Sequence, residues 1–204
     1  MNNTEILNFE IKRKAFHLCS IIFPIAYLFV SKFTMSSILL LLTCFTLYVD
    51  IYRHYDGNIK WVTNKFLGKF LRPEERRGKS SLTGCVYMGL GFLISCIFFS
   101  KGLAITSWLI LIISDASASI IGIRYGLPLP NGKSYIGSIV FFVSAIFISI
   151  VTYFLIGYST SFGIIIISSL LATIVEFFSK EINVNDNLLI PITYATSTFV
   201  LGLV

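Results

Sequence analysis

Two acidic residues lie inside apolar stretches of this 204-residue chain, where an ionised carboxylate is costly. Asp115 stands in "LIISDASASIIGIRYG", and Glu176 stands in "ATIVEFFSK". Acids in such places face a polar cavity, a metal or a partner more often than lipid. The position of Asp115 favours a functional role over simple helix–helix contact. For Glu176, a functional role and a carboxylate that reaches water at a helix end are equally open.

A lysine-containing loop follows the first of these acids. The stretch "GLPLPNGKSYIGS" includes Gly-Lys-Ser, the end of a phosphate-binding P-loop motif, which also needs a glycine five positions before Gly132. That position is Leu127, and two prolines stiffen the interval, so the motif is excluded. Glycines, Lys133 and Ser134 still offer groups that bind a phosphate. Helical spacing places Asp115, Ser119 and Gly122 on one stripe that points toward this loop.

The composition predicts an integral membrane protein. Hydrophobic residues make up 55% of the chain, charged residues make up 13%, and the mean hydropathy is +0.83. We therefore expect an all-α, polytopic membrane bundle that forms a single domain over residues 1–204, with about seven transmembrane helices. The predicted spans are residues 17–30, 34–49, 82–100, 102–122, 136–157, 161–178 and 188–204.

The basic residues predict the orientation of the bundle. When the N-terminus is placed in the cytosol, every Lys and Arg except Lys32 and Lys101 falls on the cytosolic side. His17, Asp115, Lys133, Glu176 and the run 183–187 then gather at cytosolic helix ends. A cleavable signal peptide is a competing interpretation of the N-terminus. So apolar a chain gives little support to nucleic-acid binding, and the four scattered cysteines show no metal or redox spacing.

The segment 56–72 carries apolar residues at helical spacing among lysines. This pattern predicts an amphipathic helix in the membrane interface, ending before Pro73. An ordinary surface helix is the alternative.

Together these residues indicate a site for a magnesium-bound polyphosphate. Asp115 and Glu176 would hold Mg²⁺ or another divalent cation, while Lys133 and backbone N–H groups would bind phosphate oxygens. His17 is either part of this site or a polar anchor at the interface. A lipid acceptor would enter sideways from the bilayer.

Four blocks, in order along nearly the whole chain, give it a family resemblance. They are "EIKRKAFHL", "RPEERRGKSSLTGCVYMGLG", "SDASASIIGIRYG" with "NGKSYIGS", and "VEFFSKEINVNDNLLIP". In these blocks the chain resembles the CTP-dependent lipid-alcohol kinases, which include dolichol kinase, phytol kinase and a CTP-using diacylglycerol kinase. The resemblance implies an enzyme that transfers the γ-phosphoryl group of CTP to a lipid hydroxyl at the cytosolic face.

The resemblance also implies roles for particular residues. With the loop and the helical stripe, it gives a CTP site of Ser119, Gly122, Gly126, Asn131, Gly132, Lys133, Ser134 and Gly137. Asp115, Lys133 and Glu176 are the expected catalytic residues. Supporting roles are implied for Arg13, His17, Thr83, Gly84, Asp186 and Asn187. Where the family usually has a glutamate this chain has Ile136, which cannot bind a metal, so Glu176 or Glu74 would have to compensate.

Two other functions stay open beside the kinase. A cytidylyltransferase that forms a CDP-lipid shares part of the aspartate and lysine pattern. A non-catalytic membrane protein or transporter is suggested by Ile136. The expected partners are CTP and a lipid alcohol, whose identity, like the oligomeric state, has no signal in the sequence.

Overall fold

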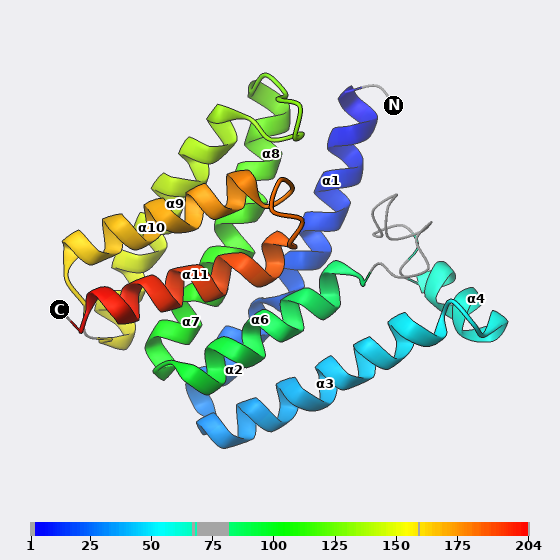
Figure 1. Cartoon of the computed structure of the whole chain (residues 1–204), viewed down its shortest axis with the longest axis horizontal. Helices are drawn as coiled ribbons and strands as arrows, with labels where there is room; N and C mark the ends of the chain where they lie inside the picture. The colour runs from blue at the N-terminus through cyan, green and yellow to red at the C-terminus, as the bar shows by residue number, and fades with distance from the viewer. Residues whose placement is uncertain (1–2, 67, 69–81, 159, 204) are drawn as a thin grey trace.

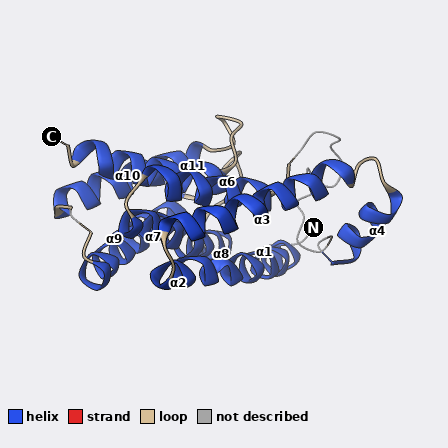
Figure 2. Ribbon diagram, turned by 90° about the horizontal axis from the view of Figure 1, so that it is seen from below, coloured by secondary structure: helices blue, strands red, loops and turns tan. Residues whose placement is uncertain are grey.

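Every regular element among the residues that the computed structural model describes, 3–66, 68, 82–158 and 160–203, is helical (Figures 1 and 2). This confirms the predicted all-α class. The elements are α1 (Asn3–Leu18), η1 (Cys19–Ile21), α2 (Ile22–Phe29), α3 (Lys32–Tyr52), α4 (Gly57–Phe66), α6 (Gly84–Phe98), α7 (Lys101–Leu109), η2 (Ile110–Ser114), α8 (Asp115–Tyr125), α9 (Tyr135–Ile156), α10 (Phe162–Phe178) and α11 (Asp186–Leu201).

The helices pack in two layers (Figure 2). In one layer α3 lies beside α6, α6 beside α11, and α11 beside α10. In the other, α8 lies between α1 and α9. Contacts of α9 with α10 and of α7 with α11 join the layers. Helices that are distant in sequence therefore meet at one end of the molecule.

Three helical segments of the described chain have the length and apolar composition to cross a membrane. They are Lys32–Tyr52, Lys101–Tyr125 and Tyr135–Ile156, and two shorter apolar helices are α6 and α10. The length and apolar composition of these helices are those of a membrane protein. Each of the seven predicted spans coincides with helical structure, although the first belongs to a longer helical run that begins at Asn3. Seven spans and a cytosolic N-terminus stay predictions.

Polar side chains define where several helices begin. Ser31, Ser134, Ser161 and Asn185 each accept a hydrogen bond from a backbone N–H of the helix that follows. Helix α9 ends at Gly157, whose φ of 73° is in the left-handed region that glycine adopts without strain. Of these caps, Ser134 and Asn185 fix the amino ends of α9 and α11, where the candidate site lies.

The core is organised around Trp108 of α7. Its ring stacks on Tyr27 and Phe92, with centroid distances of 5.3 and 4.7 Å, and its Nε1 donates to Ser95 Oγ at 2.7 Å. Helix α7 continues through the π-helical segment η2 directly into α8. Single-turn π segments occur frequently at functional sites, and this one ends immediately before Asp115.

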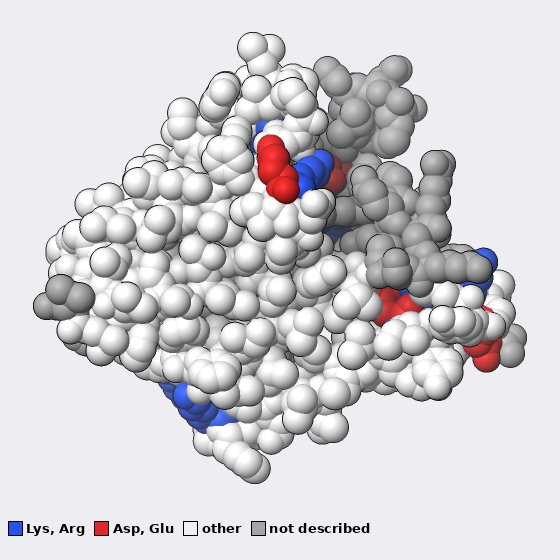
Figure 3. Space-filling view, in the orientation of Figure 1, with Lys and Arg blue, Asp and Glu red and all other residues white. Residues whose placement is uncertain are grey.

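Charge is distributed unevenly over the surface. On the face in Figure 3, charged side chains lie mainly near α4 and the α10–α11 loop, with one basic group toward the opposite end. At that opposite end, Lys32 Nζ donates to Phe99 O at 3.1 Å, and Lys101 Nζ donates to Leu28 O at 2.9 Å. These two lysines therefore cap helix ends, where cations are favoured.

The described part of the predicted interfacial segment is helix α4. Trp61 and Val62 are exposed, and Lys65 lies over the Trp61 ring at 4.5 Å from its centroid. Phe70 and Pro73 lie outside the described residues, so the end predicted for this helix is not part of the structure.

Candidate functional site

A cavity of about 910 Å³ lies where α1, the α8–α9 loop and the α10–α11 loop come together (Figure 1). Ligand sites commonly measure about 300–1,000 Å³, so this cavity is large enough for a nucleotide. The predicted site residues that line it are Arg13, Ser119, Gly122, Gly126, Gly132, Lys133, Ser134, Gly137, Glu176 and Asp186. The fold therefore brings together residues from four separate stretches of the sequence.

Lys133 is the centre of the charged groups in this cavity. Its ammonium donates to Glu176 Oε1 and lies 3.5 Å from Asp186 Oδ2. Burial alone would lower the pKa of Lys133, but the carboxylates of Asp186, Glu176 and Asp115 together raise it above the ordinary value for lysine. Lys133 is therefore a permanent cation, held between two acids on different helices.

The loop that carries Lys133 is tied down by its own hydrogen bonds. Asn131 Nδ2 donates to Phe177 O at 3.1 Å and to Glu181 Oε1 at 3.0 Å, while Asn131 Oδ1 accepts from Lys133 N at 3.0 Å. Gly132, at φ 76°, makes the turn. The amide of Asn131 thus anchors the loop to the end of α10, and it does not line the cavity.

Three predicted glycines let α8, the loop and α9 approach one another. A Cβ on Gly122 would lie 2.7 Å from Ser134 Oγ and 3.2 Å from Gly137 Cα, and one on Gly126 would lie 2.5 Å from Ser134 Oγ. Ser134 Oγ also accepts from Gly137 N at 3.1 Å, which caps α9. The amino end of α9 consequently opens into the cavity, and helix amino ends attract anions.

Asp115 is buried below the cavity and does not line it. Its carboxylate forms an ion pair with Lys14 of α1, and both side chains are almost fully buried. Asp115 still interacts electrostatically with Asp186 and Lys133. Its Oδ1 atom has no hydrogen-bond partner among the described residues. The sequence placed Asp115 toward the Lys133 loop, and the structure gives it a closer partner that the sequence did not identify.

The remaining predicted residues lie elsewhere. His17, Thr83, Gly84 and Asn187 line a second, smaller cavity, and Arg13 lines both cavities. Glu74 lies outside the described residues. Ile136 is 40% exposed and lines neither cavity.

Sequence reasoning missed three charged residues near the site. In the sequence Lys14 stands out only as part of a basic run before an apolar segment, although its spacing of three residues from His17 puts both on one helical face. Glu10 accepts from Arg13 at 2.8 Å, and Lys180 lines the cavity beside Gly132. No signal in the sequence linked Lys180 to the loop.

The acids present fit a magnesium ion shared with a polyphosphate. Mg²⁺ usually takes one or two carboxylates together with substrate phosphates and waters. Glu176 and Asp186 already converge on one cation, Lys133, and Asp115 has a buried oxygen without a partner in the described chain. Among the same residues no group of three or more His, Cys, Asp or Glu side chains is arranged to hold a metal ion by itself, so the phosphates would have to supply further ligands.

Comparison with known proteins gives relatives of different distance. The chain is 51% identical over 195 residues to the uncharacterized protein RP860 of Rickettsia prowazekii, covering 96% of both chains. It is 34% identical over 122 residues to the uncharacterized protein MJ1137 of Methanocaldococcus jannaschii, covering 59% of this chain and 60% of the relative. It is 29% identical over 143 residues to the probable phytol kinase 1, chloroplastic, of Oryza sativa subsp. japonica, covering 64% of this chain and 44% of the relative.

Neither of the two other comparisons gave a match. No protein-family model matches the chain, and no solved structure matches it.

Proposed function

The chain belongs to the same family as RP860 of Rickettsia prowazekii, and we propose that it is a CTP-dependent kinase of a membrane lipid alcohol. The distant similarity to a probable phytol kinase supports a lipid kinase. The four sequence blocks support CTP as the phosphoryl donor. The alignment covers less than half of the rice protein, so the proposal depends chiefly on the site in this chain.

The observation that carries the proposal is the position of Lys133. It stands with Glu176 and Asp186 at the amino end of α9, inside a cavity of about 910 Å³. Arg13 and Lys180 add two further cations to the lining. Phosphoryl transfer asks a protein mainly to position the reactants and to stabilise negative charge. The cations and backbone N–H groups can stabilise negative charge, and the convergent carboxylates can position a metal ion and Lys133.

In the proposed reaction the oxygen of the lipid hydroxyl forms a bond to the γ-phosphorus of CTP. The bond from that phosphorus to the β,γ-bridging oxygen breaks, and its electron pair leaves on CDP. The hydroxyl proton is released to water, and the lipid becomes a monophosphate. Lys133 and the N–H groups at the start of α9 bind the triphosphate oxygens and stabilise the charge that develops on them.

We propose that Glu176 and Asp186 hold Mg²⁺ together with the phosphates of CTP. Asp115 lies deeper in the bundle than these two residues and does not line the cavity. When bound, the ion would neutralise phosphate charge and orient the β- and γ-phosphates. Glu176 and Asp186 in turn hold the ammonium of Lys133 in the cavity.

We also propose that the cavity opens at the cytosolic face of the membrane. The basic residues lie on this side of the predicted topology, which is the asymmetry of a cytosolic surface. CTP would then enter from water, and the lipid from the bilayer.

Radiolabelled CTP tests the reaction. Purified protein in detergent is incubated with phytol, a polyprenol, diacylglycerol or phosphatidic acid, magnesium, and CTP labelled at the α- or the γ-phosphate. Phosphatidic acid is included because a CDP-lipid forms only on a lipid that already carries a phosphate. The kinase transfers the γ-label to the lipid phase, and Lys133→Met abolishes the transfer. Lys12→Met, a change of the same kind on the exposed side of α1, leaves it intact.

Each other outcome contradicts the kinase. Transfer of the α-label to lipid identifies a cytidylyltransferase. Transfer of neither label, from protein that remains folded, identifies a non-catalytic protein.

A further inference from the structure

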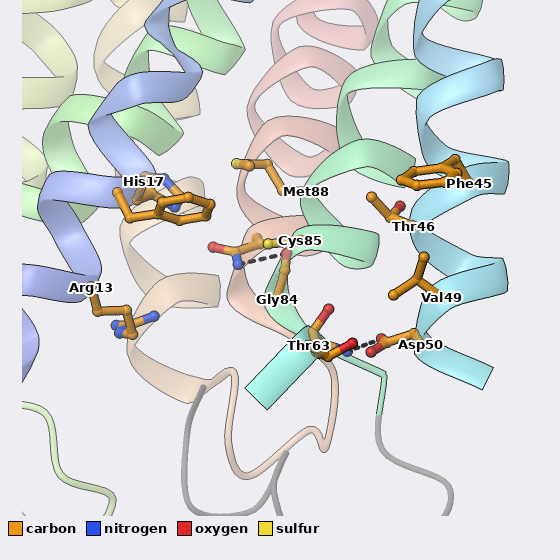
Figure 4. A pocket seen from close by; sticks show the side chains of 13 residues that line it. Arg13, His17, Phe45, Thr46, Val49, Asp50, Thr63, Gly84, Cys85 and Met88 are labelled. Atoms are coloured by element: carbon orange, nitrogen blue, oxygen red, sulfur yellow. Dashed lines mark hydrogen bonds between the residues drawn. The ribbon is translucent and has the colours of Figure 1, made fainter. Parts of the chain in front are cut away.

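A second cavity, of about 310 Å³, lies between α1, α3 and α6, where α4 and the start of α11 also meet. Figure 4 shows Arg13 and His17 of α1 on one side, and Phe45, Thr46, Val49 and Asp50 of α3 on the other. No step of the proposed phosphoryl transfer uses this cavity.

The lining has an apolar side and a polar side. Phe16, Phe45, Val49 and Met88 line the cavity with carbon and sulfur atoms. Phe45 is 64% exposed and Phe16 is 39% exposed, so the apolar side continues onto the outer, lipid-facing surface of the bundle. An occupant with an apolar tail could therefore extend from this cavity into the bilayer.

Two buried polar atoms of the polar side have no hydrogen-bond partner within the described structure. They are His17 Nε2 and Asn187 Oδ1, on side chains more than nine-tenths buried. Asn187 Nδ2 donates to Gly84 O at 3.0 Å, which fixes the amide and leaves its oxygen as the free acceptor. An unpaired buried polar atom is costly, so each of these two atoms needs a hydrogen-bonding partner.

A single hydroxyl matches these two atoms. It can donate its hydrogen to Asn187 Oδ1 and accept a hydrogen from His17 Nε2–H. The polar neighbours on α3 and α6 are already engaged, since Asp50 pairs with Arg53 at 2.9 Å and accepts from Thr83 N at 2.5 Å. The lining of the cavity is therefore complementary to one hydroxyl group at the end of an apolar chain.

This cavity adjoins the larger cavity that contains Lys133. Arg13 lines both, and the chain passes from one to the other between Asp186 and Asn187, and again between Tyr87 and Met88. A hydroxyl bound by His17 and Asn187 thus lies next to the groups that would hold the triphosphate.

We propose that the cavity between α1, α3 and α6 binds the hydroxyl end of the lipid-alcohol acceptor, with His17 and Asn187 as its hydrogen-bond partners. The identification of the bound alcohol as the phosphoryl acceptor rests on the proposed function. It adds the place of the acceptor and the residues that recognise its hydroxyl.

Photo-crosslinking tests the binding without any need for turnover. The probe is phytol with a diazirine beside its hydroxyl, added to the purified protein in phosphatidylcholine vesicles. Adducts are expected on peptides of α1, α3 and α6 that line the cavity. Excess phytol should displace them, and the matching hydrocarbon without a hydroxyl should not. Adducts spread over the outer helices, or equal displacement by the hydrocarbon, would overturn the proposal.

Two kinds of variant separate recognition from folding. His17→Leu should weaken displacement by phytol roughly tenfold, whereas His17→Gln, which keeps a donor N–H, should retain most of it. His54→Leu, the same change outside the cavity, should have no effect. Phe45→Trp adds bulk at the exposed mouth and should reduce labelling in a protein that still folds.

An active preparation gives an independent measurement. His17→Leu should raise the KM for phytol roughly tenfold and leave the KM for CTP, measured at saturating phytol, unchanged. If specific labelling occurs but no phosphate is transferred, the acceptor site stands and the kinase proposal fails. If phosphate is transferred but His17→Leu changes neither labelling nor the KM for phytol, the acceptor site is wrong.

Discussion

Two buried lysines, Lys14 and Lys133, show how differently one side chain can be used in this protein. Lys14 is fully enclosed, and among the described residues its ion pair is with Asp115 alone. Lys133 is partly open to the cavity and pairs with both Glu176 and Asp186. A ligand can reach Lys133 without unfolding the bundle, whereas Lys14 is positioned to balance Asp115. Of the two, Lys133 is the residue that can exchange protein carboxylates for phosphates.

Replacing Lys133 should reduce both stability and activity. In Lys133→Met the two acids lose their common cation, and removing one member of a buried ion pair typically costs about 3–5 kcal/mol in the free energy of unfolding. Loss of a charged hydrogen bond to phosphate, about 1.5–3 kcal/mol, should weaken CTP binding about ten- to a hundredfold. Unfolding in detergent and CTP titration measure these changes.

A second substitution separates the two effects. Adding Glu176→Gln to Lys133→Met removes one uncompensated charge, so the unfolding free energy should partly recover. CTP binding should not recover. If binding returned together with stability, the role of Lys133 would be structural only.

The raised pKa of Lys133 also predicts its pH dependence. Its stabilising interaction is fully present below the pKa of an unfolded lysine, about 10.4, and is lost only as pH rises through the higher folded value. The difference in unfolding free energy between the native protein and Lys133→Met should therefore not decrease as the pH rises from about 6 to 9. A difference that shrinks between pH 7 and 9 would show that Lys133 loses its proton there.

At the scale of elements, the close crossing of α8 and α9 positions the loop that carries Lys133. Gly122 and Gly137 allow this approach, with Ser134 between them. The sequence singled out these glycines as part of a nucleotide site, and the structure shows a packing role for them. Both roles serve the same geometry, because the start of α9 faces the cavity only when the helices are this close.

Adding a methyl group at this crossing should disrupt it. Gly122→Ala places a Cβ 2.7 Å from Ser134 Oγ and 3.2 Å from Gly137 Cα, so the helices must separate. Overpacking of this kind typically costs about 1–3 kcal/mol. We expect a lower melting temperature and weaker CTP binding.

Gly163→Ala in α10 is the matched control. A Cβ there would have its nearest neighbouring atom outside the helix backbone, Ser161 Oγ, at an ordinary 3.9 Å. Alanine in place of glycine inside a helix is worth up to about 1 kcal/mol in stability. The control should therefore be as stable as the native protein or more so. Equal losses in both variants would remove the special role of the crossing.

Apolar periodicity and composition sufficed to predict the helices. Helical spacing predicted that Asp115, Ser119 and Gly122 share a stripe toward the Lys133 loop; Ser119 and Gly122 do line the cavity with Lys133, whereas Asp115 does not. The pair of Lys14 and Asp115 could not be predicted, because the two residues are 101 positions apart and meet only where α1 packs on α8. For the same reason the sequence could not show that His17 and Asn187 share a second cavity. Local patterns determine helices, but the partners of a buried charge depend on which helices become neighbours.

At the scale of the whole molecule, the two ends of the bundle differ in charge. The candidate site brings Arg13, Lys133 and Lys180 to one end, while Lys32 and Lys101 are bonded to helix termini at the other. This difference is the basis for the proposed orientation in the membrane.

Labelling of single cysteines tests that orientation. In a background without the native cysteines, Asn183→Cys at the site end should react with a membrane-impermeant maleimide only after cells are permeabilised. Phe33→Cys, exposed beside Lys32 at the other end, should react in intact cells. The reverse pattern would place the candidate site outside the cell and remove its access to CTP.

Arg13 lines both cavities, so a ligand that moves its side chain in one cavity also changes the wall of the other. Its guanidinium is now held by Glu10, and an anion or an alcohol that draws it away changes the shape that the second molecule meets. Affinities linked in this way must change by the same factor in both directions. We therefore expect a bound lipid to alter how tightly CTP is held, and bound CTP to alter the hold on the lipid by an equal amount.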